Sequence, residues 1–265
     1  MNRVVVLSSG GEFTHRLLDT LDRRGIVLDA LVVYAPPVKA TGARGRVLAP
    51  LRRLRRQLRL RLDRRLRGGA RQVVYTGGLN SARMERDLRR LAPDVVVLAR
   101  TGLLGDPILA IPPGGVVNVH PGLLPWIRGN SPFGNALLRD VPLGGTAFRV
   151  DPGIDTGAVL QRRLVPVRGT ETHAELRDAL FRLWVEMTAD WIAAAAAGPL
   201  PAGTPQTGRF PICRTNGAAD EPAVARLCGE GAAKRLFNRW SPLCAAPDLA
   251  LPADADAGFL PRPEA

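Results

Sequence analysis

Three polar residues, Asn118, His120 and Asp155, stand among turns rich in glycine and proline in the central part of the chain. They combine an amide that can donate a hydrogen bond, an imidazole that titrates near neutral pH and a carboxylate that can orient it. The stretch Val116–His120 is typical of a strand, and residues two apart on a strand face the same side, so Asn118 and His120 point together. The set predicts a polar active site for acid–base chemistry at a strand end.

Each of the three residues also has a structural interpretation. A single buried histidine is usually only hydrogen-bonded, and both asparagine and Asp-x-Gly are common in turns. Their occurrence together favours the active site. Pro121 ends the strand and biases His120 towards an extended backbone. If the Asp155 carboxylate meets His120, we expect it to orient the imidazole and to favour its protonated form.

Short apolar runs bounded by polar turns predict the elements that position these residues. The predicted strands are Val4–Leu7, Leu28–Tyr34, Gln72–Tyr75, Asp94–Ala99 and Gly115–His120. Helical patterns lie between them at Thr14–Arg24 and at Ser81–Leu91, where Ser81 stands at the N-cap position. This alternation predicts an α/β fold, a Rossmann-like open and mostly parallel sheet with helices on both faces, whose ligands bind at the carboxyl ends of the strands.

Composition restricts the class of protein. The 265 residues are 46% hydrophobic and 23% charged, as in a globular protein of one large domain with a smaller appendage. The first residues do not form a signal peptide and no apolar run reaches the roughly 18 residues of a membrane span, so we expect a cytoplasmic protein without a transmembrane segment. The three cysteines, Cys213, Cys228 and Cys244, lie far apart, which disfavours a disulfide framework or a metal site.

The chain divides by composition into two parts. We expect a catalytic domain over residues 1–198 with a basic insert at 40–70, followed by an extension over residues 199–265. The extension is rich in proline and glycine and predicts irregular chain, with a short helix or two within Glu221–Trp240 and a loosely ordered end from Ala245.

The basic insert has a pattern of its own. Between Arg44 and Arg67 there are eleven arginines against one aspartate, which gives this segment a charge of +10 out of +13 for the chain. Apolar residues recur every three or four positions, which predicts a helix with one apolar stripe. Three interpretations remain open: a helix packed on the core or on a second subunit of a homodimer, a site for tRNA or a nucleotide-linked substrate, and a helix on a membrane surface.

The stretch from Leu91 to Gln161 resembles the catalytic domain of the 10-formyltetrahydrofolate-dependent formyltransferases. That family includes methionyl-tRNA, glycinamide ribonucleotide and sugar amine formyltransferases. The residues that match its pattern, in order, are Asn118, His120, Leu123-Leu124-Pro125, Arg128-Gly129, Pro132, Gly145-Thr146 and Asp155-Thr156-Gly157. The sequence departs from the pattern at Gly122, where several relatives have serine, and at Phe148, near which some have histidine.

The resemblance implies a role for each catalytic candidate. Asn118 would donate its amide to the formyl oxygen as charge develops there, and His120, held by Asp155, would assist that stabilisation and the proton transfer. The donor, 10-formyltetrahydrofolate, would lie along the segment after the fourth strand and against the loop before Asp155. The residues expected to bind it are Arg100, Thr101, Gly102, Leu103, Leu104, Asp151 and Gly153. A cis peptide between Leu124 and Pro125 is also implied.

The resemblance therefore implies an N-formyltransferase. We expect its acceptor to be a small-molecule amine, either an amino sugar or an amine of secondary metabolism. One alternative is a methionyl-tRNA formyltransferase variant that uses Arg44–Arg67 for tRNA, because a basic loop near this position contacts tRNA in that enzyme. The other alternative is an inactive homologue that binds a polyanion, which the intact Asn118, His120 and Asp155 set disfavours. Formyltetrahydrofolate hydrolase is disfavoured because nothing resembles its regulatory domain.

Overall fold

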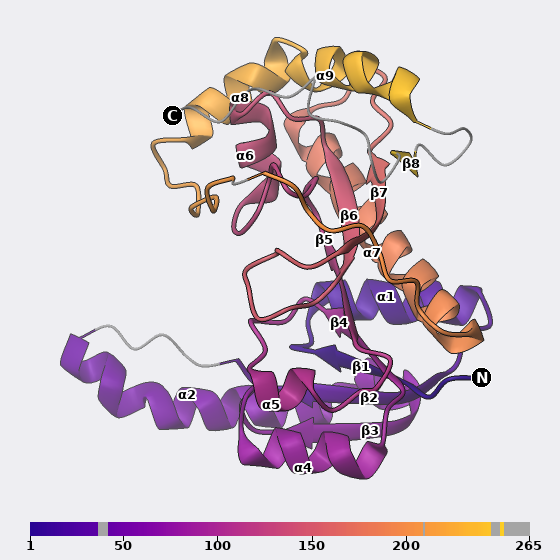
Figure 1. Ribbon diagram of the computed structural model, residues 1–265. Coiled ribbons are helices and arrows are strands. Elements are labelled where there is room, and N and C mark those ends of the chain that lie inside the picture. The colour runs from indigo at the N-terminus through magenta and orange to yellow at the C-terminus, as the bar shows by residue number, and fades with distance from the viewer. Residues whose placement is uncertain (37–41, 209, 245–249, 252–265) are drawn as a thin grey trace. The chain divides into compact units, whose positions relative to one another are not determined.

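The computed structural model describes residues 1–36, 42–208, 210–244 and 250–251 (Figure 1). The chain forms two compact units. The first unit comprises Met1–Val117 and Thr188–Leu200, and the second comprises Asn118–Met187 and Pro201–Ala265. The boundary predicted at residue 198 was based on composition and stays a prediction. In the structure, most of residues 199–265 belong to the same compact unit as Asn118.

The first unit contains the predicted parallel sheet. Its strands lie in the order β3-β2-β1-β4, and every adjacent pair is parallel. They are β1 (Val4–Ser8), β2 (Leu28–Tyr34), β3 (Ala70–Thr76) and β4 (Val95–Ala99), each within two residues of its predicted bounds. All residues of β1 and β4 are buried, because a strand covered on both faces is apolar on both sides. The open α/β fold class is confirmed.

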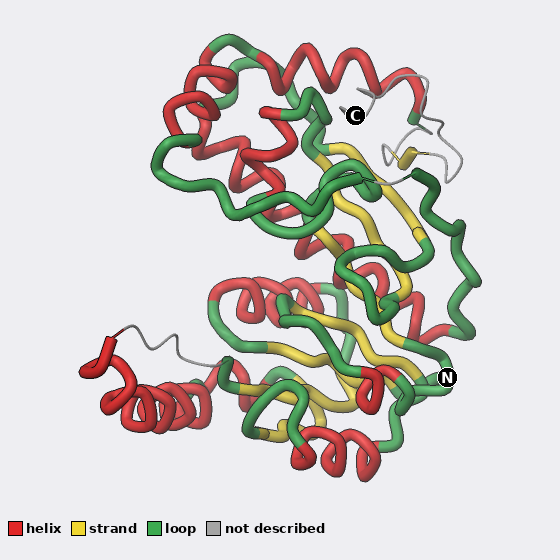
Figure 2. Tube along the Cα trace, turned by 60° about the vertical axis from the view of Figure 1, so that its left-hand side comes forward, coloured by secondary structure: helices red, strands yellow, loops and turns green. Residues whose placement is uncertain are grey.

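Helices cover both faces of this sheet (Figure 2). They include α1 (Glu12–Arg23), α4 (Ala82–Leu91) and the short α5 (Asp106–Leu109). The Ser81 side chain accepts a hydrogen bond from the backbone N–H of Met84 at 3.2 Å, which confirms the predicted N-cap of α4. The buried residues of α4 are Met84, Leu88 and Leu91, which recur at helical spacing on one face.

The arginine-rich insert is helical, as predicted. It forms α2 (Gly42–Leu62) and α3 (Arg64–Gly68). Asp63 lies between them, where its side chain caps α3 by accepting from the backbone N–H of Arg65 and contacts the His15 ring at 2.6 Å. The predicted apolar stripe consists of Val47, Leu51, Leu54, Leu58, Leu62 and Leu66, and of these only Leu66 is buried. Leu60, which lies outside the predicted stripe, is partly buried. The stripe therefore does not pack on the core of its own unit.

The second unit continues β5 (Val116–His120), whose last three residues belong to it. Its strands lie in the order β5-β6-β7-β8, with β6 (Gly144–Arg149), β7 (Val159–Leu164) and β8 (Ala250–Leu251). The pairs β6/β7 and β7/β8 are antiparallel. The sequence did not predict β6 or β7, because Gly144-Gly145 and Arg162-Arg163 interrupt the apolar pattern of these two strands.

Residues after 200 complete the core of the second unit. This core lies under α6 (Pro132–Leu138), α8 (Glu221–Gly229) and α9 (Ala232–Trp240), with the 3-10 turn η1 (Ser241–Leu243) after α9. Trp240 of α9 packs its ring edge-on against Trp126, with the ring centroids 5.3 Å apart. The two helices confirm the prediction for Glu221–Trp240. The part of the predicted loose end at 245–249 and 252–265 lies outside the described residues.

A long helix, α7 (His173–Ala197), continues from the second unit into the first. Its last turn is the alanine run Ala193–Ala197. Among the described helices, none is long and apolar enough to cross a membrane. The three cysteines are free, with Cys213 and Cys228 buried.

Candidate active site

The end of β5 presents Asn118 and His120 to the same side of the strand. Val117 and Val119 alternate with them and are buried. The Trp184 indole of α7 donates a hydrogen bond to the Val119 carbonyl at 2.7 Å, and this bond holds the backbone at the end of β5 in place. The Asn118 amide is partly exposed and makes no hydrogen bond within the described part of the chain, so it can donate to a ligand.

Asp155 faces His120, as predicted. Its Oδ2 lies 3.6 Å from His120 Nδ1, and both side chains are largely buried. The same oxygen accepts a hydrogen bond from the Gly129 backbone N–H at 2.8 Å. A separation of 3.6 Å is longer than a hydrogen bond, so the carboxylate and the ring form an electrostatic pair. Catalytic hydrogen bonds are often long before substrate binds, so a separation of 3.6 Å is compatible with a catalytic pair.

The loop that carries Asp155 is held by its own polar groups. Asp151 Oδ1 accepts from the Thr156 hydroxyl at 2.6 Å and from the Gly153 backbone N–H at 3.1 Å. A Cβ at Gly153 would lie 2.0 Å from Thr156 Oγ1, so this tight turn requires glycine. Asp155 itself has a φ of 52°, in the left-handed region that aspartate and asparagine tolerate better than most residues. The loop is built to hold one conformation.

Two long side chains attach this loop to neighbouring segments. The Arg128 guanidinium donates to the Ile154 carbonyl through Nε at 3.0 Å and through Nη2 at 2.8 Å. Gln206 donates to the carbonyls of Asp155 and Gly157 at 3.0 and 2.8 Å. Arg128 belongs to the motif recognised in the sequence, but Gln206 was missed, since its segment reads as irregular chain with no functional pattern.

Burial dominates the electrostatics of His120. The imidazole is 6% exposed, and burial lowers its pKa below the ordinary 6.5 although the Asp155 charge and a backbone hydrogen bond with Ile127 act in the opposite direction. Asp155 thus favours the protonated form, as expected, but burial outweighs its effect and the net pKa of His120 is lowered. A neutral ring whose Nδ1 faces a carboxylate carries its proton on that nitrogen. The lone pair is then on Nε2, which is buried and has no partner in the described structure.

Because residue 122 is a glycine without a side chain, the His120 ring can occupy the space beside it. A Cβ at this position would lie 2.9 Å from His120 Nε2 and 2.9 Å from Ile127 Cγ2. Real Cβ atoms essentially never approach other atoms so closely, so a larger residue would displace the ring. The departure from the family pattern at this position therefore bears directly on the placement of the imidazole.

Thr146 and Arg162 support the turn between Gly122 and Pro125. The Thr146 hydroxyl donates to the Gly122 carbonyl at 2.8 Å and accepts from the Leu124 N–H at 3.0 Å. Arg162 Nε donates to the Leu124 carbonyl at 2.7 Å, and burial lowers the pKa of Arg162 to about 10, which leaves it charged at neutral pH. The Leu124–Pro125 peptide is cis, as the resemblance implied.

Arg162 was missed in the sequence, although a signal was present. Alternation along β7 places Arg162 on the same side as the buried Leu164, where an arginine requires hydrogen-bonding partners. The interrupted apolar pattern concealed the strand, and without the strand this alternation could not be used.

The residues expected to bind folate fall in both units. Asp151 and Gly153 form the turn described above, and the segment of Arg100 to Leu104 follows β4 in the first unit. In that segment Gly102 N–H donates to the Tyr34 hydroxyl at 3.0 Å, and the Leu103 carbonyl accepts from Asn80 at 2.9 Å. These bonds fix the backbone, while the Leu103 side chain is exposed. Folate binding by these residues stays a prediction.

The fold and the site together define a class. An α/β protein that presents an unpaired amide and a neutral imidazole with a free lone pair at a strand end suits group transfer to a nucleophile that must lose a proton. The profile of the formyl transferase family matches residues 1–186, and the chain belongs to this family. Members of the family take their formyl group from 10-formyltetrahydrofolate, so the chain is a folate-dependent formyltransferase.

Curated relatives are methionyl-tRNA formyltransferases. The enzyme of Stenotrophomonas maltophilia (strain K279a) is 32% identical over 223 residues, which cover 80% of this chain and 67% of that protein. The enzyme of Xylella fastidiosa (strain 9a5c) is 33% identical over 180 residues, which cover 67% of this chain and 55% of that protein. The matches thus span about two thirds of the first relative and about half of the second.

Solved structures share the fold at lower identity. A sugar N-formyltransferase from Shewanella sp FDAARGOS_354 has a TM-score of 0.51 and 16% identity, covering 86% of this chain and 87% of that one. A glycinamide ribonucleotide transformylase from Symbiobacterium toebii has a TM-score of 0.53 and 23% identity, covering 78% of this chain and 95% of that one. At these identities the likeness concerns the fold alone.

Proposed function

We propose that this chain moves the formyl group of 10-formyltetrahydrofolate to the amine of a small-molecule acceptor. The observation that carries the chemistry is the pairing of an amide without a partner, on Asn118, with a buried and unpartnered Nε2, on His120. A buried polar atom without a partner is costly, so its presence at a strand end favours a function in binding. The residues therefore fit a bound formyl donor.

Each catalytic residue has one task in this proposal. The Asn118 amide donates to the formyl oxygen as negative charge develops there, a contribution worth roughly 10²–10³ in rate at comparable sites. His120 Nε2 accepts the proton that the attacking amine loses. Asp155, at 3.6 Å from Nδ1, holds the ring and stabilises the positive charge that the ring then acquires. Asp155 is a positioning residue, because it acts through His120.

In this proposal the folate donor is bound mainly by backbone groups. The segment of Arg100 to Leu104 and the turn from Asp151 to Gly153 would hold the folate through backbone groups and the exposed Leu103 side chain. Asp151 would act indirectly, since its Oδ1 is already occupied by Thr156 and by the Gly153 N–H.

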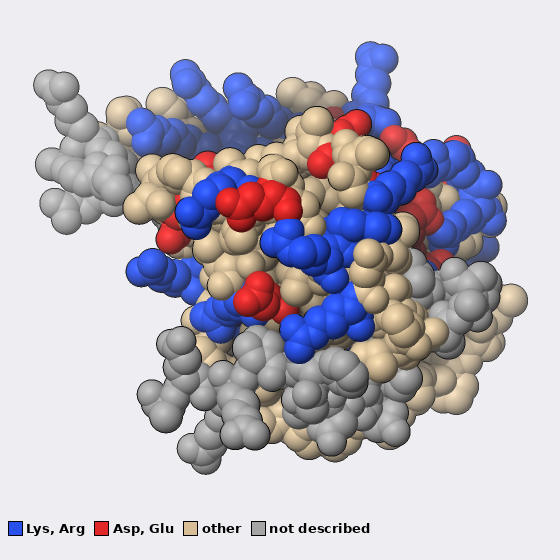
Figure 3. Space-filling view, turned by 90° about the horizontal axis from the view of Figure 1, so that it is seen from above, with Lys and Arg blue, Asp and Glu red and all other residues tan. Residues whose placement is uncertain are grey.

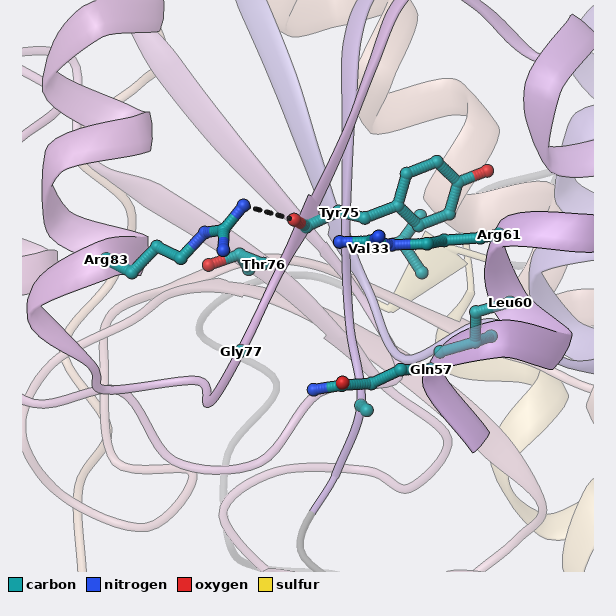
Figure 4. Close-up of a pocket in the computed structure, with 9 residues that line it drawn as sticks. Val33, Gln57, Leu60, Arg61, Tyr75, Thr76, Gly77 and Arg83 are labelled. Carbon is teal, nitrogen blue, oxygen red and sulfur yellow. Dashed lines mark hydrogen bonds between the residues drawn. The ribbon is translucent and has the colours of Figure 1, made fainter. Parts of the chain in front are cut away.

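A pocket in the first unit supports an acceptor that carries phosphate (Figure 4). It has an empty volume of about 350 Å³, including its open mouth, and lies between α2 and the ends of β2 and β3. Arg61 and Arg83 extend towards it, and the Arg83 guanidinium also donates to the Tyr75 carbonyl at 3.4 Å. Its lining includes Thr76, whose buried hydroxyl has no partner in the described structure. Guanidinium groups and a hydroxyl suit a phosphate, which favours a nucleotide-linked amino sugar.

A second candidate acceptor is methionyl-tRNA. The curated relatives that cover most of this chain act on it, as their names state. The arginines of α2 would then contact the phosphate backbone, and binding would weaken steeply with salt. An amine of secondary metabolism remains an acceptor of the same class as the amino sugar.

One experiment separates these acceptors. The protein is mixed with 10-formyltetrahydrofolate and, in separate reactions, a nucleotide-linked amino sugar, a panel of simple amines and methionyl-tRNA, and the release of tetrahydrofolate is followed. We expect turnover with a phosphate-bearing amine and its loss in Asn118→Ala and His120→Ala. Turnover with methionyl-tRNA alone would replace the acceptor proposal, and no turnover or folate binding with any acceptor would refute the enzymatic one.

A further inference from the structure

One side of α2 exposes a continuous row of aliphatic side chains. The members are between 43% and 78% exposed and, apart from one adjacent pair, recur every three or four residues. They are Val47, Leu48, Leu51, Leu54, Leu58 and Leu62, called here the α2 stripe. At 3.6 residues per turn, all but Leu48 fall within about a quarter of the helix circumference. Soluble proteins rarely expose contiguous apolar surface, so the α2 stripe indicates a surface that binds a partner.

A different side of α2 packs on the first unit. Gln57, Leu60 and Arg61 line the pocket between this helix and the strands (Figure 4). The Leu60 side chain lies against Gly10, where a Cβ would come within 2.5 Å of it. Leu60 stands roughly 160° around the helix from Leu58, so the packed side and the α2 stripe face different directions. The helix is held by one side and offers the other to solvent.

The charge around the α2 stripe has one sign. The helix contains no Asp or Glu, and its exposed arginines are Arg52, Arg53, Arg55, Arg56, Arg59 and Arg61. None of these six forms an ion pair with a carboxylate in the described part of the chain. Elsewhere the charges are mixed: basic and acidic side chains adjoin on the face in Figure 3, and on α8 Arg226 pairs with Glu230 at 3.9 Å. The partner of α2 must therefore be both apolar and anionic.

Two other occupants meet only part of this requirement. A second copy of the chain would cover the leucines, but it would bring two helices of the same charge together without a single carboxylate between them. Nucleic acid would neutralise the arginines, but it would leave the leucines in water. An anionic phospholipid surface satisfies both, because acyl chains receive the leucines while lipid phosphates receive the arginines, whose stems extend to the interface.

We propose that α2 binds anionic phospholipid membranes through the α2 stripe and its flanking arginines. The helix lies in the plane of the interface, with the leucines in the outer part of the acyl region. This inference does not depend on the acceptor, because no residue of the α2 stripe lines the pocket proposed for it, which takes Gln57, Leu60 and Arg61 from this helix.

Vesicle co-sedimentation of the full chain tests the proposal. One set of vesicles contains equal parts of phosphatidylcholine and phosphatidylglycerol, and the other contains phosphatidylcholine alone. We expect binding to the first set only, weakening as salt increases. The double variant Leu54→Gln/Leu58→Gln should bind at least about tenfold more weakly, since burial of apolar area sets the affinity together with charge. Arg55→Gln/Arg59→Gln should weaken binding as well.

The matched control is Val27→Gln, which removes an exposed aliphatic side chain of the same unit outside α2 and should leave binding unchanged. The leucine positions are exposed, so these variants should fold, and circular dichroism checks this. Absence of binding to the anionic vesicles would overturn the proposal. A dimer of the native chain that becomes monomeric in the leucine variant would also overturn it. So would RNA binding that requires the arginines, if vesicle binding is the same in the leucine variant and the native chain. Turnover in vesicle-free buffer should be the same for the leucine variant and the native chain, which separates this test from that of the proposed function.

Discussion

Replacement of Asp155 by asparagine tests how the carboxylate acts. The substitution keeps the size of the side chain, preserves an acceptor for the Gly129 N–H and suits the backbone, because asparagine tolerates the φ of 52° found here. It removes one negative charge that lies 3.6 Å from His120 Nδ1. At an effective dielectric constant of about 20, two unit charges at this distance interact with roughly 5 kcal/mol. This is the stabilisation that the imidazolium formed during proton transfer would lose.

Two effects should follow. The turnover number should fall by about 10²–10⁴, the range associated with general acid–base catalysis. The pKa of His120 should also decrease further, since Asp155 is the neighbouring charge that raises it. Proton acceptance requires the neutral ring, so activity is present above this pKa and is lost as pH falls through it. The acidic limb of kcat/KM should therefore move to lower pH in the variant.

The assay measures tetrahydrofolate release against pH with an acceptor that turns over, and ¹H–¹⁵N NMR follows the ring of His120 directly. The chain has only three histidines, so assignment is tractable. Asp140→Asn is the matched control, because Asp140 has a φ of 53°, is exposed and lies outside the site. An Asp155→Asn variant with unchanged turnover and an unmoved acidic limb would refute the role of this pair.

Three further substitutions and one pH dependence test other parts of the site. Asn118→Ala should reduce turnover by about 10²–10³ while folate binding, followed by fluorescence, persists; an equal loss of binding would contradict its role as an oxyanion donor. Gly122→Ala places a Cβ 2.9 Å from His120 Nε2 and should lower the turnover number by displacing the ring, so full activity would disprove the crowding. Thr146→Val leaves the Leu124 N–H and one carbonyl unpaired and should cost about 1–3 kcal/mol for each group, seen as a lower midpoint of denaturant unfolding. The free energy of unfolding should decline as pH falls below 6.5, because the unfolded chain binds a proton at His120 more readily than the folded one, and His120→Asn should reduce that slope.

The sequence predicted the first unit well because its strands have strong local patterns. The runs at Val4–Ser8 and Val95–Ala99 are apolar throughout, and the cap at Ser81 marks a helix start that the structure confirms. Such features depend on neighbouring residues alone. The strand β7 was not predictable in this way, because the buried Arg162 contradicts the apolar pattern. Contacts that accommodate it include those with Leu124 and Trp126, which lie far away in sequence.

The candidate site was partly predictable for the same reason. Strand alternation predicted that Asn118 and His120 lie on one side of β5, and the Asp-x-Gly motif predicted that the Asp155 carboxylate belongs to the same site. The protonation state could not be derived, since it depends on how completely the fold buries the ring. The role of Gln206 could not be predicted either, because it depends on a contact with the Asp155 loop, 51 residues earlier in the chain.

The assignment of Asn118, His120 and Asp155 to a single compact unit has an evolutionary consequence. If these residues catalyse the proposed reaction, selection acts on a geometry that is set within that unit by contacts such as those from Gln206 and Gly129. An insertion such as α2 falls in the other unit, so a lineage can acquire, lengthen or recharge it without rebuilding the catalytic geometry. The chemistry can therefore be inherited while the surfaces around it diverge, and arginine-rich inserts should vary among relatives far more than the amide, the imidazole and the carboxylate.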